Sequence, residues 1–263
     1  MHRIDSGFRL PDQISDLWVR RMLIYGDPMV LDRWRWIASR LPTRKCFVLD
    51  AGSGNGSIAT NVGRLGHSVV ALNFSESELQ RCQRRNPYPN VTFELQDLRS
   101  LGERDDLRDR FDVVICTEVI EHVLDDRKCM HDLAKTLKTG GQLLLTTPNL
   151  DYRPLDGKVE PPYEPIEDGR HVRKGYDDRQ LRRLAQTADL DVIDIQYCSG
   201  DWSQRLTRWY RDLHSWTDPR IASILITPLR FLPLLRDRAQ WPPFSICLEA
   251  SPSGDDRSRV DSL

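Results

Sequence analysis

The glycine-rich segment 48–56 reads Val-Leu-Asp-Ala-Gly-Ser-Gly-Asn-Gly, and it constrains the fold more than any other part of the chain. Apolar residues that end at Asp50 predict a buried strand, and the helical spacing over 57–65 predicts a helix directly after it. Because glycine has no Cβ, a turn with three glycines lets the backbone bend sharply and approach a ligand closely. We therefore predict a strand–turn–helix unit with a ligand at the turn.

Short apolar runs alternate with helical stretches along most of the chain. This alternation is typical of a parallel sheet with helices on both faces. The expected strands cover 46–49, 69–72, 91–95, 113–116, 143–146, 192–197 and 244–248. The sequence therefore predicts a doubly wound α/β fold, in which ligands bind at the carboxyl ends of the strands.

The two ends of the chain depart from this alternation. Helical spacing over 12–41 predicts two helices, which form an N-terminal helical cap at 1–43 before a main domain at 44–250. The last residues, 251–263, are polar and are expected to form a disordered tail.

The charges of the chain nearly cancel, because 38 Lys and Arg oppose 39 Asp and Glu and the net charge is −1. Contact with a phosphate backbone usually needs a basic excess, so no nucleic acid partner is expected. The six cysteines form no Cys-x-x-Cys pair, which favours reduced thiols and a cytoplasmic location. The start of the chain lacks the apolar core of a signal peptide, and no window resembles a membrane span.

Two classes of ligand fit the glycine turn. A dinucleotide loop has the spacing Gly-x-Gly-x-x-Gly, whereas the third glycine here comes one residue early. Asp50 stands before the first glycine, and a carboxylate repels pyrophosphate but attracts the ammonium group of an amino-acid tail. A short-chain reductase would also need a Tyr followed by Lys four positions later, which the sequence lacks. The turn therefore favours a ligand with an amino-acid tail.

The pattern Asp-x-Gly-x-Gly-x-Gly resembles the first motif of class I S-adenosylmethionine-dependent methyltransferases. Further matches lie at 71–75, 96–98, 111–116 and 137–141. The resemblance covers about 44–197 and is to the small-molecule type, similar to ubiquinone-biosynthesis O-methyltransferases. It implies a Rossmann-like seven-stranded sheet of order 3-2-1-4-5-7-6 with the seventh strand antiparallel.

The resemblance also implies how S-adenosylmethionine is held at the first motif. Asp50 would lie close to the amino group of the methionyl part, and the backbone of the turn would line the cofactor. The turn residues concerned are Gly52, Ser53 and Gly54.

Residues after the next three strands would hold the rest of the cofactor. Asn73 stands where the family usually has an acidic side chain on the ribose hydroxyls, and an amide still offers one acceptor and two donors. Asp97 would accept the adenine amino proton, and the backbone amide of Leu98 would meet a ring nitrogen. Thr117 and Glu118 complete the expected cofactor site.

Two histidines are the expected catalytic residues. Methyl transfer is an in-line displacement at an activated carbon, so the protein mainly holds the acceptor in position, but a hydroxyl acceptor also needs a base. His122 and His171 follow the fourth and fifth strands, where loops reach the cofactor. We therefore expect O-methylation of a small molecule, such as a natural product, sugar or phenol. N-methylation is the alternative, and a cofactor-binding module with a dead site, which Asn73 hints at, is the non-enzyme alternative.

A divalent cation, Mg²⁺ or Mn²⁺, is a further expectation. If a helical turn began at Glu118, it would place Glu118, Glu121 and His122 on one face. Glu-x-x-Glu-His resembles the cation-binding segment of ubiquinone-biosynthesis O-methyltransferases and of small-RNA 2′-O-methyltransferases, whose downstream histidine His171 would match. A metal-assisted 2′-O-methyltransferase of an RNA end is therefore an alternative. The same string is also common in small-molecule methyltransferases with no known metal role. In that alternative interpretation, His122 is structural and Glu118 packs near the cofactor.

An insert is expected at about 200–242, between the last two strands, with amphipathic helices over 202–213 and 220–236. Three interpretations are open: a cover over the acceptor site, a homodimer or core-packing element, or an interfacial membrane helix that presents a lipid-linked acceptor. The aromatic residues concerned are Trp202, Trp209, Tyr210 and Trp216.

Overall fold

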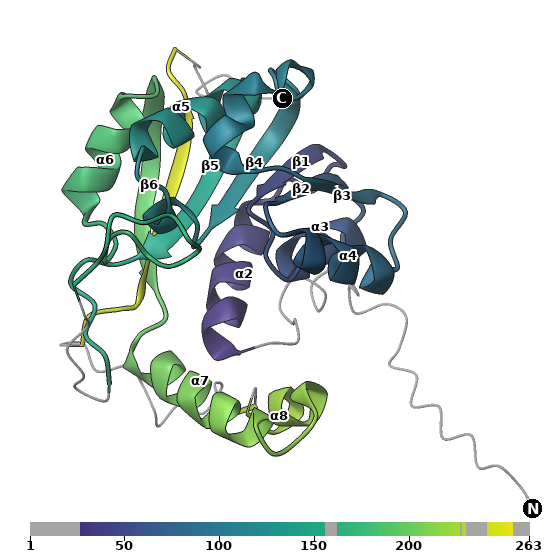
Figure 1. The fold of residues 1–263 in the computed structure, drawn as a ribbon, viewed down its shortest axis with the longest axis vertical. Coiled ribbons are helices and arrows are strands. Elements are labelled where there is room, and N and C mark those ends of the chain that lie inside the picture. Colours follow the sequence, from purple (N-terminus) through teal and green to yellow (C-terminus); the bar gives the residue numbers. More distant parts are fainter. Residues whose placement is uncertain (1–26, 156–161, 227, 230–240, 255–263) are drawn as a thin grey trace, which may run out of the picture.

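A seven-stranded sheet forms the centre of the computed structural model, which describes residues 27–155, 162–226, 228–229 and 241–254 (Figure 1). Its strand order is β3-β2-β1-β4-β5-β7-β6. The neighbouring pairs of the first five strands are parallel, whereas β7 is antiparallel to both β5 and β6. The doubly wound α/β fold and the antiparallel seventh strand are therefore confirmed.

All seven expected strands are present. They are β1 (Phe47–Ala51), β2 (Ser68–Asn73), β3 (Val91–Leu95), β4 (Phe111–Thr117), β5 (Leu137–Pro148), β6 (Leu190–Cys198) and β7 (Ser245–Pro252). The last strand extends beyond the expected domain end, because Ser251 pairs with Asp191 and Pro252 pairs with Leu190. The first two residues of the expected tail thus belong to the sheet, and 255–263 lie outside the described residues.

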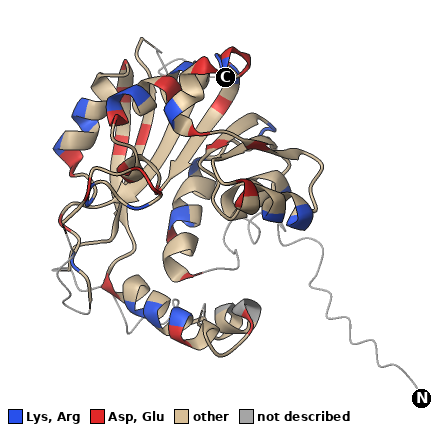
Figure 2. Cartoon of the chain, in the orientation of Figure 1, with Lys and Arg blue, Asp and Glu red and all other residues tan. Residues whose placement is uncertain are grey.

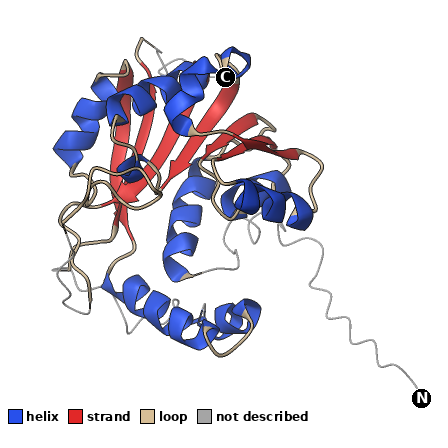
Figure 3. Cartoon of the chain, viewed as in Figure 1, coloured by secondary structure: helices blue, strands red, loops and turns tan. Residues whose placement is uncertain are grey.

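Helices cover both faces of the sheet, while charged residues lie mostly on helices and loops (Figures 2 and 3). One face packs against α2 (Pro28–Arg40), α3 (Ser57–Arg64) and α4 (Glu76–Arg85), and the other against α5 (Asp126–Thr136) and α6 (Asp178–Gln186). Side chains alternate across a strand, so Val48 joins the first of these cores and Leu49 the second. The sheet is therefore buried on both sides, which explains its continuous apolar runs.

The helix α2 links the N-terminal part to the far edge of the sheet. It begins at Pro28 after the N-cap Asp27, whose side chain accepts a hydrogen bond from the backbone N–H of Val30. Near its other end, Arg40 forms ion pairs of 2.8 Å with Asp194 on β6 and with Glu249 on β7. The second of the two expected N-terminal helices is thus confirmed, and the first lies outside the described residues.

The expected insert contains α7 (Asp201–His214) and α8 (Pro219–Ile226). The two helices share a small core of Leu206, Tyr210, Ala222 and Ile226. The insert also contacts α2, since the Met29 N–H donates to Thr207 Oγ1 at 3.2 Å. The described part of the second expected helix ends at Ile226; residues 227 and 230–240 lie outside the described part of the chain. Within the described residues, no helix has both the length and the apolar character needed to cross a membrane.

The segment that follows β5 is fixed at Gly175. Its backbone lies against Pro148, whose carbonyl oxygen accepts from the Tyr176 N–H at 3.0 Å. Gly175 has a φ of +146°, and a Cβ at this position would lie 2.0 Å from the Pro148 oxygen. No residue other than glycine fits here without a backbone shift.

We expect Gly175→Ala to lower the free energy of unfolding by about 3 kcal/mol, because it combines an unfavourable φ with a clash against backbone. Gly254→Ala is the control, since Gly254 has a φ of +88° with no atom near the added Cβ. We expect that substitution to cost only about 1–2 kcal/mol. Urea unfolding of the full chain measures both, and equal losses would contradict the importance of the Pro148 contact.

Candidate functional site

The glycine turn joins β1 to α3 through a tightly bonded backbone. The N–H groups of Gly52 and Ser53 donate to the Leu72 carbonyl of β2, at 3.1 and 2.7 Å. Gly52, Gly54 and Gly56 all have positive φ. A Cβ on Gly52 would lie 2.5 Å from Cγ2 of Val119, which belongs to the segment after β4. The turn is therefore packed between the ends of two neighbouring strands and requires glycine.

Asp50 lies beneath this turn. Its side chain is fully buried, and Oδ2 accepts from the Ala59 N–H of α3 at 3.0 Å. Oδ1 has no hydrogen-bond partner among the described residues. Burial raises the pKa of Asp50 to about 7, although the bond from Ala59 opposes this. The buried carboxylate thus ties β1 to α3, and it is not among the residues that line the cavity above the turn.

The cavity itself has a volume of about 220 Å³ and lies at the carboxyl ends of the strands. This is the edge at which doubly wound sheets bind ligands. The expected site residues that line it are Gly52, Gly54, Asn73, Asp97, Leu98, Glu118 and His122. Ser53, Thr117 and His171 are not part of its lining.

Asn73 supports the turn through both ends of its amide. Nδ2 donates to the Gly54 carbonyl at 2.7 Å, and Oδ1 accepts from the Ser75 N–H at 2.9 Å. An aspartate at this position would lack the donor to Gly54. The amide therefore stabilises the glycine turn besides facing the cavity.

Asp97 carries a partner that the sequence did not reveal. Arg99 donates to both of its carboxylate oxygens, and this hydrogen bonding lowers the pKa of Asp97 although partial burial opposes it. Arg99 also reaches Glu167 at 3.2 Å, and Glu167 accepts from the Leu124 N–H at 2.6 Å. The segment after β5 is thus attached to the same wall of the cavity as Asp97.

Seven lining residues were missed by the sequence analysis. They are Phe74, Gln96, Arg99, Val119, Val123, Glu167 and Gly169. The first five directly adjoin predicted site residues, so their proximity to the motifs was a usable signal. Glu167 and Gly169 come from a long loop, whose path across the cavity has no local sequence signature.

Glu118 directly follows β4 and adopts a φ of 53°, which is uncommon for a residue with a side chain. No helical turn begins at Glu118, because the 3-10 turn η3 covers only Ile120–His122. The condition for placing Glu118, Glu121 and His122 on one helical face is therefore not met. The Glu118 carboxylate accepts from Thr146 and from Ser245, at 3.0 and 3.2 Å. These contacts hold its carboxylate beside β5 and β7.

Arg33 of α2 completes the surroundings of Glu118. Its Nη1 lies 3.9 Å from Glu118 Oε2 and donates to Ser245 Oγ at 3.4 Å. Burial disfavours the charged guanidinium, but nearby groups, chiefly the Glu118 carboxylate, outweigh this and raise the pKa of Arg33. No pattern in the sequence indicates this contact, because residues 33 and 118 meet only through the fold.

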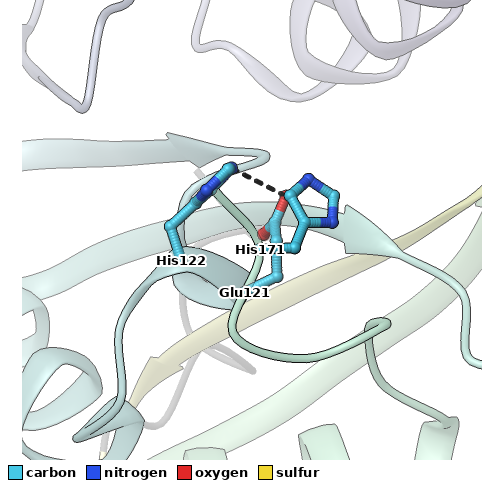
Figure 4. A group of neighbouring side chains, drawn as sticks. All are labelled: Glu121, His122 and His171. Carbon is cyan, nitrogen blue, oxygen red and sulfur yellow. Dashed lines mark ion pairs between the residues drawn. The ribbon is translucent and has the colours of Figure 1, made fainter. Parts of the chain in front are cut away.

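Glu121, His122 and His171 form a second group beside the cavity (Figure 4). Glu121 Oε1 lies 3.8 Å from His122 Nε2 and 4.0 Å from His171 Nε2, and the two rings meet edge to face. One possible ligand atom from each of the three lies within 4.8 Å of the others. The structure thus brings both predicted histidines together with Glu121, while Glu118 stands outside this group.

The carboxylate of Glu121 is fully buried, and burial followed by the charge of Glu118 raises its pKa well above the usual range. Its Oε2 accepts from Thr147 Oγ1 at 3.0 Å, whereas Oε1 has no hydrogen-bond partner among the described residues. The loop with His171 is held nearby, because the Val172 N–H donates to the Glu121 carbonyl at 3.0 Å. A cation or a proton would therefore be favoured beside Oε1.

The buried Asp50 makes stability depend on pH. The unfolded chain releases this proton near pH 4, while the folded chain keeps it until about pH 7. The folded state therefore loses relative stability as the pH rises through this interval, and loses no more above it. We expect Asp50→Asn to gain about 3 kcal/mol relative to the parent between pH 5 and pH 8, measured by urea unfolding. The parent and the variant share all other titrating groups. If their free energies of unfolding changed in parallel with pH, this result would contradict a raised pKa at Asp50.

Curated relatives match somewhat less than half of the chain. An enzyme of Coxiella burnetii called ubiquinone biosynthesis O-methyltransferase is 27% identical over 123 residues, which cover 46% of this chain and 51% of the relative. The chain thus spans about half the length of the curated relatives it matches.

Solved structures match a larger part of the chain at lower identity. An S-adenosylmethionine-dependent methyltransferase of Mesorhizobium loti has a TM-score of 0.55 and 19% identity, over 83% of this chain and 96% of the other. The [4+2]-cyclase SpnF has a TM-score of 0.55 and 17% identity, over 84% of each chain. These similarities concern the fold, which hosts more than one chemistry.

The sequence profile of the methyltransferase domain family matches residues 42–209. This is more than half of the chain, and it contains the glycine turn, the cavity walls and both histidines. The chain therefore belongs to the methyltransferase domain family, within the class I S-adenosylmethionine-dependent methyltransferases.

Proposed function

We propose that this protein transfers the methyl group of S-adenosylmethionine to a hydroxyl oxygen of a small molecule. One observation carries the proposal: a single cavity joins the glycine turn and Asp97 to His122, so a cofactor site and a polar side chain able to take a proton adjoin each other. The Coxiella burnetii relative is called an O-methyltransferase, which supports oxygen as the acceptor atom.

The residues around the cavity fit the cofactor. Gly52 and Gly54 line it, and Gly54 has no atom within 4 Å of where its Cβ would lie, so the backbone there is open to a ligand. Asp97 is held in its ionised form by Arg99, and a carboxylate can accept a hydrogen bond from an exocyclic amine. Glu118, which lines the cavity, adds negative charge near a cofactor that carries a positive sulfonium.

The protein's main contribution to such a reaction is position. Displacement at a sulfonium carbon needs the acceptor oxygen in line behind the methyl group, and holding it there supplies much of the rate enhancement. S-adenosylmethionine supplies the activated methyl group. His122 lines the cavity after β4, and it is the residue that can receive the acceptor's proton.

His171 has a supporting role in this proposal. Its ring packs against the edge of His122, with centroids 4.5 Å apart, and it lies 4.0 Å from Glu121. Glu121 Oε1 lies within 4.0 Å of both imidazoles, and in its ionised form it can stabilise the positive charge that forms when His122 takes a proton. Both histidines would then act in catalysis, His122 directly and His171 by fixing its orientation.

A divalent cation is the second candidate, supported by the Glu121–His122–His171 group. One carboxylate and two imidazoles suit Mn²⁺ or a similar ion, and the unpartnered Oε1 of Glu121 faces both rings. Such an ion would polarise the acceptor hydroxyl and make an additional base unnecessary. In this case a catechol or another vicinal diol would be the preferred acceptor.

Cofactor binding tests the family assignment of Asp97. We expect Asp97→Ala to weaken S-adenosylmethionine binding at least about tenfold, because a charge-assisted hydrogen bond to the adenine is lost. The control is Asp106→Ala, which removes a comparable Asp–Arg ion pair with Arg104 outside the cavity lining. Isothermal titration calorimetry gives both affinities; equal weakening, or tighter binding of NAD, would contradict the proposal.

The acceptor and the cation are tested with methyl-labelled S-adenosylmethionine and a panel of phenols, catechols, sugars and amines. We expect labelled O-methyl products, and only N-methyl products would reject oxygen as the acceptor. If a cation acts, a chelator lowers the rate at least about tenfold, added Mn²⁺ or Mg²⁺ restores it, and His171→Ala abolishes the restoration. His131→Ala on α5 is the matched control. Indifference to chelator would leave His122 as the base.

A further inference from the structure

The helices α7 and α8 of the insert, with the turn between them, present a group of exposed apolar side chains. This group consists of Trp209, Trp216, Ile221, Ile224 and Leu225. Together with the exposed Arg208, these residues are called the hairpin face. Trp216 is 88% exposed and Ile224 is 62% exposed. Such exposure is costly in water for large apolar side chains and marks a surface that meets something else.

The hairpin face points away from the rest of the protein. Leu206 and Tyr210 of α7 face Ala222 and Ile226 of α8 in their shared core. The Thr207 side chain meets α2. Residues at three- or four-residue spacing share a side of a helix, so Ile221, Ile224 and Leu225 lie on a side of α8 that this core leaves uncovered. Trp216 lies in the turn between the two helices.

The insert is also a basic part of a nearly neutral chain. Residues 200–242 contain seven Arg and four Asp and no Lys or Glu, a net charge of +3, whereas the whole chain has −1. Arg208 is exposed and makes no ion pair with any described residue, while Arg211 lies 3.5 Å from Asp27. The arginines on α7 can be followed in Figure 2. Four of the seven Trp also fall in this insert.

We propose that the hairpin face binds an anionic membrane surface, with α7 and α8 lying in the plane of the headgroups. Tryptophan favours the boundary between water and acyl chains, and arginine pairs with lipid phosphates, so the two enriched residue types match the two layers of a bilayer surface. Anionic lipid complements the charge of +3. The proposal does not depend on which acceptor is methylated.

A second copy of the chain fits this surface less well. In a twofold dimer the same patch meets itself, so the exposed Arg208 of each copy would lie on the shared surface and the two positive charges would repel. A lipid surface instead provides the opposite charge and an apolar layer below it.

The location of the insert gives such binding a purpose. α7 begins at Asp201, directly after the carboxyl end of β6, and β6 runs in the same direction as β5. The insert therefore extends from the edge of the sheet that carries the cofactor cavity (Figure 1). Binding through the hairpin face would bring that edge close to acceptors that reside in or on a membrane.

Co-sedimentation of the full chain with phosphatidylcholine vesicles, with or without 30% phosphatidylglycerol, tests the proposal. We expect binding to the anionic vesicles at low salt and at least about fivefold less binding to neutral vesicles or in 0.5 M NaCl. The double substitution Trp216→Ser and Ile224→Ser should lower the partition coefficient about tenfold, and Arg208→Glu about fivefold.

Matched controls are Ile193→Ser on β6 and Arg179→Glu on α6, which change an exposed apolar residue and an exposed arginine elsewhere. Both should sediment like the parent, and every variant should keep its circular dichroism spectrum and its affinity for S-adenosylmethionine. Absence of binding to anionic vesicles, with cofactor affinity intact, would overturn the proposal. So would a dimer in light scattering that the Trp216 and Ile224 substitutions dissociate without any effect on sedimentation.

Discussion

The close packing of the glycine turn against the segment after β4 is the constraint on which the rest of the site depends. Gly52 leaves room for Val119, and the Gly52 and Ser53 amides are bonded to Leu72, so the ends of β1, β2 and β4 are fixed relative to one another. This is the point where the strand order reverses direction, and the cavity opens there. Any side chain at Gly52 would separate these strand ends and change the shape of the cavity.

Buried carboxylates give the site its electrostatic character. Asp50 lies under the turn, Glu118 lines the cavity and Glu121 lies next to both histidines, and each is at least partly withdrawn from water. Desolvation raises the pKa of Asp50 and of Glu121, which means that the protein alone poorly compensates the negative charge of each ionised carboxylate. A cationic ligand would provide the missing compensation, and a sulfonium cofactor is such a ligand.

The helix α2 connects parts of the protein that are distant in sequence. Its Arg33 reaches Glu118 in the site, its Arg40 binds β6 and β7, and its first turn contacts α7 of the insert. A buried guanidinium is favourable only while its carboxylate partners remain in place. The N-terminal helix is therefore part of the site's framework, and it links the cofactor side of the sheet to the helices that carry the hairpin face.

The sequence by itself determined the fold class, all seven strands, the glycine turn and half of the residues that line the cavity, because these depend on local periodicity and on glycine's lack of a side chain. Only the tertiary structure decided the rest. Asp50 is buried in the core, and the positive φ of Glu118 places its side chain outside the Glu121–His122–His171 group. His171 and Arg33 reach the site from distant positions in the chain. Each of these outcomes depends on contacts between residues far apart in the chain, which local patterns do not encode.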